Sequence, residues 1–136
     1  ILDCVMERGN PADSAKYLAL LDRQNEIFGR YPRQASADGG LASKDNLDKA
    51  KERGVHDVSF SKRKGLAVLD MVKSSWVYKK LRSFRAGVEA NISVLKRAFG
   101  LTRCRWSGWA GFKQYVRSAI FSYNLLTLAR LCAEPA

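Results

Sequence analysis

The chain has 136 residues, of which 46% are hydrophobic, and this length and composition suit one globular domain with a core. Lysine and arginine number 24 against 13 acidic residues, so the formal charge of +11 favours a polyanionic partner, most commonly nucleic acid. No apolar run reaches the ~18 residues of a membrane-spanning helix, and no membrane partner is expected. Three scattered cysteines and one histidine argue against a disulfide framework or a zinc site and indicate a reducing cytoplasm.

Strand and helix signals alternate at the start of the chain. The opening run Ile1–Met6 is apolar with one acid and is predicted to be a strand. A helix is expected to start at Asn10 and Pro11, which suit the cap and the first helical position, and to end at Gly29. The side chains expected on its buried face are those of Tyr17, Leu18, Leu21 and Phe28.

An acid and two glycines follow the next predicted strand, Arg33–Ala37. The acid is Asp38, and the end of a strand is where α/β folds place ligands and metals. Ser43 is expected to cap a helix over Lys44–Arg53. The segment Val55–Ser61 then alternates apolar and polar residues and is predicted to be the next strand. A strand–helix–strand run this short predicts parallel strands with a right-handed crossover.

The segment Tyr78–Leu101 predicts one long helix with an apolar stripe and a charged edge. At about 100° per residue, Arg85, Glu89 and Lys96 lie within about 40° of one another beside the stripe. A rim carboxylate between two cations suits metal-bound phosphate chemistry, because the acid can hold the metal and the bases the nucleic-acid backbone. An ordinary amphipathic helix with ion pairs one turn apart is the alternative. The stripe comprises Leu81, Phe84, Val88, Ile92, Leu95 and Phe99.

The end of the chain predicts a turn and a last helix. The turn, Arg103–Gly111, carries Trp106 and Trp109, which are expected to pack against the helix, with stacking on nucleic-acid bases as the alternative. The helix is expected over Phe112–Leu131, and its hydrophobicity almost all round predicts neighbours on more than one side. The residues expected to face inward are Phe112, Val116, Ala119, Ile120 and Tyr123.

The spacing Arg85-x3-Glu89-x6-Lys96 resembles the C-terminal signature of bacterial insertion-sequence transposases of the DDE superfamily. Arg82 departs from this signature, which has a tyrosine at that position. The order of elements resembles the second half of an RNase H-like fold, so the resemblance implies an α/β fold with a short mixed sheet flanked by helices. Residues 1–136 would form a single incomplete catalytic domain, its C-terminal half. The other matching motifs are GNPAD at Gly9–Asp13, DGGLASKDNL at Asp38–Leu47 and VSFSKRKGL at Val58–Leu66.

The same resemblance implies a metal site. Asp38 is similar to the second catalytic aspartate of the family and Glu89 to its third acid. Together with a first aspartate, these carboxylates would bind two Mg²⁺ or Mn²⁺ ions. An Asp-Gly turn is the alternative interpretation for Asp38, and an ion pair with Arg85 is the alternative for Glu89. Residues that share a metal must lie close together, so the separation of the two carboxylates tests this prediction.

DNA contacts are also implied by the resemblance. Arg85 and Lys96 are similar to bases that contact DNA phosphates in the family. Lys62, Arg63 and Lys64 follow a strand and are expected on the DNA-facing side, with a solvated loop as the alternative. The partners would be transposon ends and target DNA, and a homodimer is left open.

Two parts of the family pattern have no counterpart here: the first aspartate on an earlier strand and the domain that recognises DNA ends. Asp3 is the only early candidate for this aspartate, and it is not expected to bind metal. Since Ile1 is not an initiator methionine, we expect a piece of a longer bacterial transposase, associated with the nucleoid, that cuts and joins DNA with two metal ions. The piece is expected to be inactive alone. The alternatives are a basic nucleic-acid-binding module without metal chemistry and a decayed transposase remnant.

Overall fold

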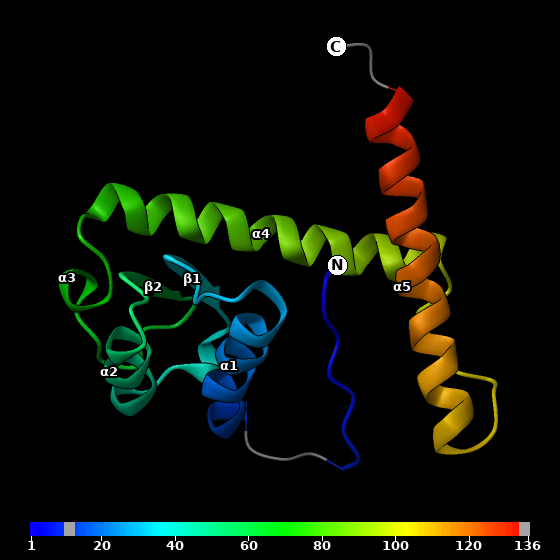
Figure 1. Cartoon of the computed structure of the whole chain (residues 1–136), viewed down its shortest axis with the longest axis horizontal. Helices are drawn as coiled ribbons and strands as arrows, with labels where there is room; N and C mark the ends of the chain where they lie inside the picture. The colour runs from blue at the N-terminus through cyan, green and yellow to red at the C-terminus, as the bar shows by residue number, and fades with distance from the viewer. Residues whose placement is uncertain (10–12, 134–136) are drawn as a thin grey trace. The chain divides into compact units, whose positions relative to one another are not determined.

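The computed structural model describes residues 1–9 and 13–133. These residues form two compact units, which we call the sheet unit (Gly9–Gly87) and the helical unit (Ile1–Arg8 with Val88–Ala136). The elements, shown in Figure 1, are η1 (Asp13–Lys16), α1 (Tyr17–Phe28), β1 (Gln34–Ala37), η2 (Gly39–Leu41), α2 (Lys44–Glu52), β2 (Asp57–Phe60), α3 (Val68–Met71), α4 (Ser75–Ala98) and α5 (Gly108–Ala133).

The sheet unit contains a parallel pair of strands between helices. β1 and β2 pair with Ala37 opposite Phe60, which confirms the predicted parallel arrangement and the α/β class. Successive side chains of a strand point to opposite faces. Phe60 meets the ring of Tyr17 in α1 on one face, with ring centroids 5.4 Å apart. On the other face, the hydroxyl of Ser36 donates to the backbone carbonyl of Leu81 in α4 at 3.1 Å.

Local signals in the sequence set the helix ends of this unit. α1 ends where Gly29 adopts a φ of 68° and its N–H donates to the carbonyl of Asn25. α2 begins after Ser43, whose hydroxyl accepts from the N–H of Asn46 at 3.0 Å. Both boundaries agree with the predictions, whereas Phe28, expected on the buried face, is 48% exposed because it lies in the last turn, beyond the core. The predicted start at Asn10 and Pro11 lies outside the described residues.

The prediction of a strand at Ile1–Met6 is wrong for this structure. The run is irregular, and its apolar side chain Leu2 is 80% exposed. A strand needs a neighbour with which to exchange backbone hydrogen bonds, and the sheet in the described residues consists of β1 and β2. The expected mixed sheet is therefore a two-stranded parallel one. Ile1 instead binds Asn124, whose side-chain amide accepts from the terminal amine and donates to the Ile1 carbonyl, both at 2.7 Å.

The apolar stripe of α4 is covered only near its ends. The helix is continuous, as predicted, but it runs from Ser75 to Ala98, three residues earlier at each end than the predicted Tyr78–Leu101. Leu81 is buried within the sheet unit and Leu95 within the helical unit. Between them Phe84 is 70% exposed, and Val88 and Ile92 are each 44% exposed, so the predicted apolar stripe is not buried along its whole length. Within its own unit, none of these three side chains is covered by another described element.

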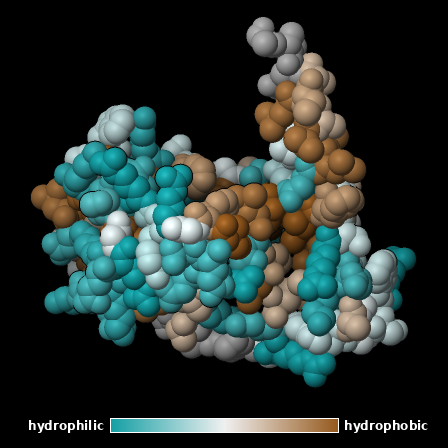
Figure 2. Space-filling view, in the orientation of Figure 1, coloured by the Kyte–Doolittle hydropathy of each residue, from teal (hydrophilic) through white to brown (hydrophobic). Residues whose placement is uncertain are grey.

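α5 packs on one side only within the helical unit. Val116 and Ala119 are buried, and Tyr123 meets Phe99 of α4 edge to face with ring centroids 5.8 Å apart. Phe121 is 68% exposed and Leu128 58% exposed, so the described residues of the helical unit do not supply the neighbours expected on several sides. Figure 2 shows apolar side chains at the surface along α5. Across residues 1–9 and 13–133, no helix is both long and apolar enough to cross a membrane.

Candidate metal and nucleic-acid site

Asp38 lies immediately after β1, at the carboxyl end of the strand. The chain turns there into η2, and Asp38 caps this turn because its Oδ1 accepts from the N–H of Gly39 at 2.6 Å. The carboxyl ends of the two parallel strands share one edge of the sheet, which is the edge where α/β folds bind ligands. The side chain of Asp38 is 67% exposed, so it remains accessible to a ligand.

Ser61 holds this carboxylate from the neighbouring strand. Because Ala37 pairs with Phe60, the residues that follow the two strands are also neighbours. The Ser61 hydroxyl donates to Oδ1 of Asp38 at 2.8 Å and accepts from the N–H of Gly39 at 2.7 Å. The sequence interpretation missed Ser61, although the parallel register, once predicted, would have placed it beside Asp38.

Gly39 lets the two strand ends approach closely. A Cβ at this position would lie 2.6 Å from Cβ of Lys62 and 3.0 Å from the Lys62 backbone nitrogen, too close for any side chain without movement. The glycine is therefore required by the close approach of Lys62. This contact keeps Ser61 within hydrogen-bonding distance of Asp38.

Arg85 reaches Asp38 from α4. Its Nη2 lies 3.2 Å from Oδ1 of Asp38, and the arginine side chain is only 20% exposed. The hydrogen bonds from Ser61 and from the Gly39 N–H, together with the charges of Arg85 and Lys62, lower the pKa of Asp38, although partial burial opposes this. The carboxylate is therefore ionised at neutral pH.

Asp38 fits one ligand position of a divalent cation. Oδ1 of Asp38 accepts hydrogen bonds from the Gly39 N–H and the Ser61 hydroxyl and lies beside the guanidinium of Arg85. Mg²⁺ and Mn²⁺ prefer ionised oxygen ligands, and Oδ2 of Asp38 can serve as one. The described residues contain no group of three or more His, Cys, Asp or Glu side chains placed to hold a metal.

Glu89 and Lys96 follow Arg85 on α4. Glu89 lies one helical turn after Arg85 and Lys96 two turns further, so the three share one edge of a continuous helix, as predicted. Both Glu89 and Lys96 are exposed. The structure brings Arg85 to Asp38, but Glu89 belongs to the helical unit and Asp38 to the sheet unit. The approach of these two carboxylates stays a prediction.

The basic residues Lys62, Arg63 and Lys64 form an exposed tip beside η2. Lys64 has a φ of 47° and turns the chain back after β2. Its Nζ donates to the carbonyl of Gly40 at 3.4 Å. The tip therefore lies at the same strand ends as Asp38, and its contact with DNA stays a prediction.

The two tryptophans of the predicted turn differ in their packing. Trp109 lies in the first turn of α5 and stacks on Phe112, with ring centroids 5.5 Å apart, while the guanidinium of Arg8 lies 5.4 Å from its ring. Packing, the predicted role, therefore describes Trp109. Trp106 is 54% exposed and packs its Cβ near Gly111.

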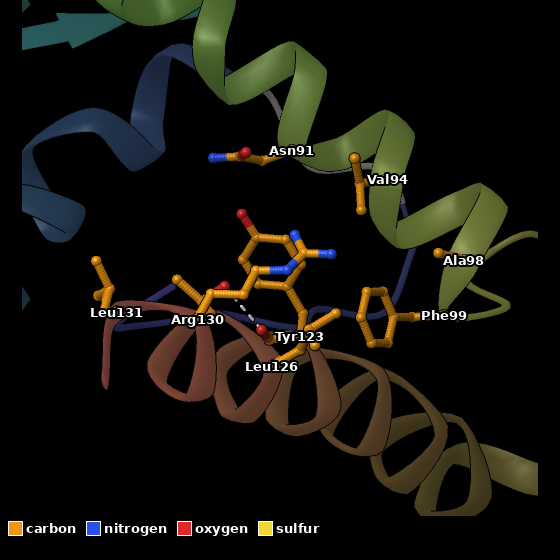
Figure 3. A pocket seen from close by; sticks show the side chains of 9 residues that line it. Asn91, Val94, Ala98, Phe99, Tyr123, Leu126, Arg130 and Leu131 are labelled. Atoms are coloured by element: carbon orange, nitrogen blue, oxygen red, sulfur yellow. Dashed lines mark hydrogen bonds between the residues drawn. The ribbon is translucent and has the colours of Figure 1, made fainter. Parts of the chain in front are cut away.

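A separate cleft of about 320 Å³ lies within the helical unit. Figure 3 shows the side chains of Asn91 and Val94 on α4 across from Tyr123 and Arg130 on α5. No acidic side chain of the described chain lines it, so its chemistry differs from that of Asp38. The lining residues are Asn91, Val94, Ala98, Phe99, Tyr123, Leu126, Thr127, Arg130 and Leu131.

Comparison with known proteins identifies the family. A family model described as a transposase DDE domain matches residues 1–125, which include Asp38, Ser61, Arg85 and Glu89. Searches of curated proteins and of solved structures found no match to the chain. Domains of this family act in DNA transposition, and they generally use divalent metal ions. The chain therefore belongs to the family of transposase DDE domains.

Proposed function

We propose that Asp38 and Glu89 are two of the carboxylates with which this domain binds divalent cations for the cleavage and joining of DNA strands. The observation that carries the proposal is the ionised Asp38 at the end of β1, held on one oxygen by Ser61 and Arg85. α4 supplies Glu89 one turn after Arg85. A shared site requires α4 to bring the Glu89 carboxylate to the end of β1.

The residues of the proposed site bind two kinds of group: the carboxylates bind metal ions, and the guanidinium contacts a DNA phosphate. In a complete site the carboxylates would hold two Mg²⁺ or Mn²⁺ ions, which would supply activation of the attacking oxygen and stabilisation of the leaving oxygen. Asp38 and Glu89 provide oxygen ligands from separate elements. Arg85 keeps Asp38 oriented and ionised, and its guanidinium is close enough to the proposed metal site to contact a scissile phosphate as well.

Cations around Asp38 would bind the DNA backbone. Lys62, Arg63 and Lys64 stand at the same strand ends, and Lys96 continues the charged edge of α4. Phosphate contacts of this kind release counterions, so the affinity for transposon ends and target DNA should fall steeply with salt.

Metal binding by single variants tests this proposal. Free Mn²⁺ is measured by electron paramagnetic resonance during titration of the wild type, Asp38→Asn, Glu89→Gln and the control Asp70→Asn, an exposed acid of α3. Each of the first two substitutions should weaken Mn²⁺ binding at least ~10-fold, and the control should change it less than ~2-fold. Unchanged binding in Asp38→Asn and Glu89→Gln would refute the proposed ligands.

We further propose that residues 1–136 alone cleave DNA poorly, because a complete family site needs a first aspartate in addition to Asp38 and Glu89. The test is cleavage of transposon-end DNA with Mg²⁺ or Mn²⁺ by this chain. Efficient cleavage would overturn the proposed inactivity while leaving the roles of Asp38 and Glu89 open to the Mn²⁺ titrations.

A basic nucleic-acid-binding module without metal chemistry is the second candidate function. The charge of +11 favours it, since charge alone supports DNA binding. It predicts tight, salt-sensitive DNA binding with no response to Mn²⁺, and no effect of Asp38→Asn on either ligand.

A further inference from the structure

A row of aromatic and basic side chains winds around the first half of α4. Trp76, Lys79, Arg82 and Arg85 follow one another at intervals of three residues, and we call these four residues the α4 ridge. Residues three apart are neighbours on a helix surface and form a continuous ridge oblique to the axis. At a rise of ~1.5 Å per residue, the ridge extends ~14 Å along the helix. All four residues belong to the sheet unit.

One end of the ridge is an open aromatic surface. Trp76 is 63% exposed, and Nζ of Lys80 lies 4.1 Å from the centroid of its ring. Such a cation–π contact orients the indole and places a positive charge beside it. Tyr78 differs, because it is partly buried and its hydroxyl donates to the carbonyl of Phe60 at 3.4 Å. Trp76 is therefore an exposed aromatic ring at the start of α4, whereas the exposed ring of Phe84 lies about two turns further along the helix.

The other end of the ridge is the candidate site. Arg85 contacts Asp38 at 3.2 Å, while Lys79 and Arg82 are exposed between it and Trp76. No acidic residue occurs in α4 before Glu89, so Lys79 and Arg82 have no carboxylate one turn away on their own helix. The ligand that suits this surface is a polyanion that also exposes flat aromatic faces. A duplex hides its base faces in the stack, whereas a single strand presents both phosphates and bases.

We propose that the α4 ridge binds one DNA strand that runs from the Asp38 site, with its phosphates on Arg85, Arg82 and Lys79 and an unpaired base stacked on Trp76. A stacked strand rises ~3.4 Å per nucleotide along its axis, so the ~14 Å axial length of the ridge corresponds to about four nucleotides. The part of this proposal in which the strand starts at the Asp38 site rests on the proposed function. Stacking of a base on Trp76 can be measured without metal or cleavage.

Fluorescence anisotropy with a labelled 10-mer single strand and the matching blunt duplex tests the stacking. All titrations contain EDTA, so a failure of the metal proposal cannot change the outcome. Trp76→Ala should weaken single-strand binding about 10-fold, which is ~1.4 kcal/mol, and duplex binding less than 2-fold. Trp76→Phe, which keeps an aromatic face, should stay within about 3-fold of the wild type. The control Phe121→Ala removes an exposed aromatic ring of the helical unit and should leave both affinities unchanged.

A second variant tests the path of the strand. The double variant Lys79→Ala, Arg82→Ala should reduce the slope of log affinity against log salt for the single strand by about 1.4. Each of the two lost phosphate contacts accounts for ~0.7 of this reduction. The proposal is overturned if Trp76→Ala weakens duplex and single strand equally, if it affects neither, or if the Lys79 and Arg82 substitutions leave the salt slope unchanged. Since Trp76 is exposed, circular dichroism should show the same folded signal for all variants.

Discussion

The guanidinium of Arg85 lies 3.2 Å from the carboxylate of Asp38. The sequence placed Arg85 beside Glu89 on one edge of a helix, but in the folded chain it also joins α4 to the end of β1. The pair therefore ties the proposed phosphate-binding base to the proposed metal ligand. A phosphate that reaches the site would compete with Asp38 for Arg85, which would couple DNA binding to the freedom of the carboxylate.

The pKa of Asp38 should respond more to Ser61 than to Arg85. The hydrogen bond from Ser61 is the largest cause of the lowered pKa, ahead of the charge of Arg85. Ser61→Ala should therefore raise the pKa of Asp38 further than Arg85→Ala, and Ser61→Thr, which keeps a hydroxyl, should change it least. Carboxyl-carbon NMR titration of the three variants measures the order. The reverse order would show that the ion pair dominates.

Ser61 should also influence metal affinity if Asp38 is a ligand. Loss of a hydrogen bond that orients a ligating carboxylate typically costs about 10-fold in affinity or more. Ser61→Ala should therefore weaken Mn²⁺ binding about 10-fold, while Ser61→Thr should restore most of it. Mn²⁺ titration monitored by electron paramagnetic resonance measures both. Equal loss in the alanine and threonine variants would point to disturbed packing of β2 instead of a lost hydrogen bond.

Alanine at two glycines of the sheet unit should have opposite effects on stability. Gly39→Ala introduces a Cβ 2.6 Å from Cβ of Lys62 and should destabilise the fold by ~1–3 kcal/mol. Gly87→Ala, inside α4 with nothing within 4 Å of the added Cβ, should stabilise it by ~0.5–1 kcal/mol. Urea unfolding measures the difference. Equal effects of the two substitutions would contradict the close approach of Lys62 to Gly39.

Asp57 should make the fold sensitive to acid. The residue is 3% exposed, and burial alone would raise its pKa, but hydrogen bonds from Gln34 and from the N–H of Lys73 outweigh burial and lower it. A lowered folded-state pKa contributes stability above the unfolded value of ~3.9, and this stability is lost as the pH falls through the folded value. The wild type should therefore lose unfolding free energy below about pH 4 more steeply than Asp57→Asn.

Removal of the same carboxylate should be costly at neutral pH. Asp57→Ala leaves the Gln34 amide and the Lys73 N–H without their acceptor and should cost ~1–3 kcal/mol. The exposed Asp48→Ala on α2 is the control and should stay within ~0.5 kcal/mol of the wild type. Urea unfolding at pH 7 compares the two variants, and similar stabilities would contradict the structural role of Asp57.

The basic tip should contribute to DNA binding through charge. Replacement of Lys62, Arg63 and Lys64 by alanine should lower the slope of log affinity against log salt on duplex DNA by up to ~0.9 for each phosphate that is no longer neutralised. The control replaces three lysines of α2 by alanine. Binding curves between 50 and 200 mM salt, a range suggested by the usual steepness of this dependence, give both slopes. A similar change in both variants would mean that net charge alone matters. The control positions are Lys44, Lys49 and Lys51.

Features coded by neighbouring residues could be predicted from the sequence. The hydroxyl of Ser43 caps α2, Gly29 closes α1, and Asp38 follows β1 directly, each within a few residues of the signal that predicted it. The continuous α4 was predicted for the same reason, since its period is visible in a single segment. These local signals also placed the candidate acid correctly at a strand end.

Features that depend on distant partners were not predictable in this way. Ser61 acquires its role only because β1 and β2 align in one register, and neither strand alone shows it. Ile1–Met6 has a strand-like sequence, but a strand also needs a neighbouring edge, which the described chain does not give it. Likewise, the apolar Phe84 is exposed because burial depends on what faces a helix and not on its period.

β1 and β2 have only four residues each, and the register between them determines which side chain lies beside Asp38. A slip of one position would replace the hydroxyl of Ser61 by the ammonium of Lys62 or the ring of Phe60, and would also reverse which side chains enter the core. The register of the two strands therefore determines both the packing of the core and the ionisation of Asp38. Substitutions at Val58 or Phe60, which contact no proposed ligand group themselves, would therefore change the surroundings of Asp38 if they shifted the register of the two strands.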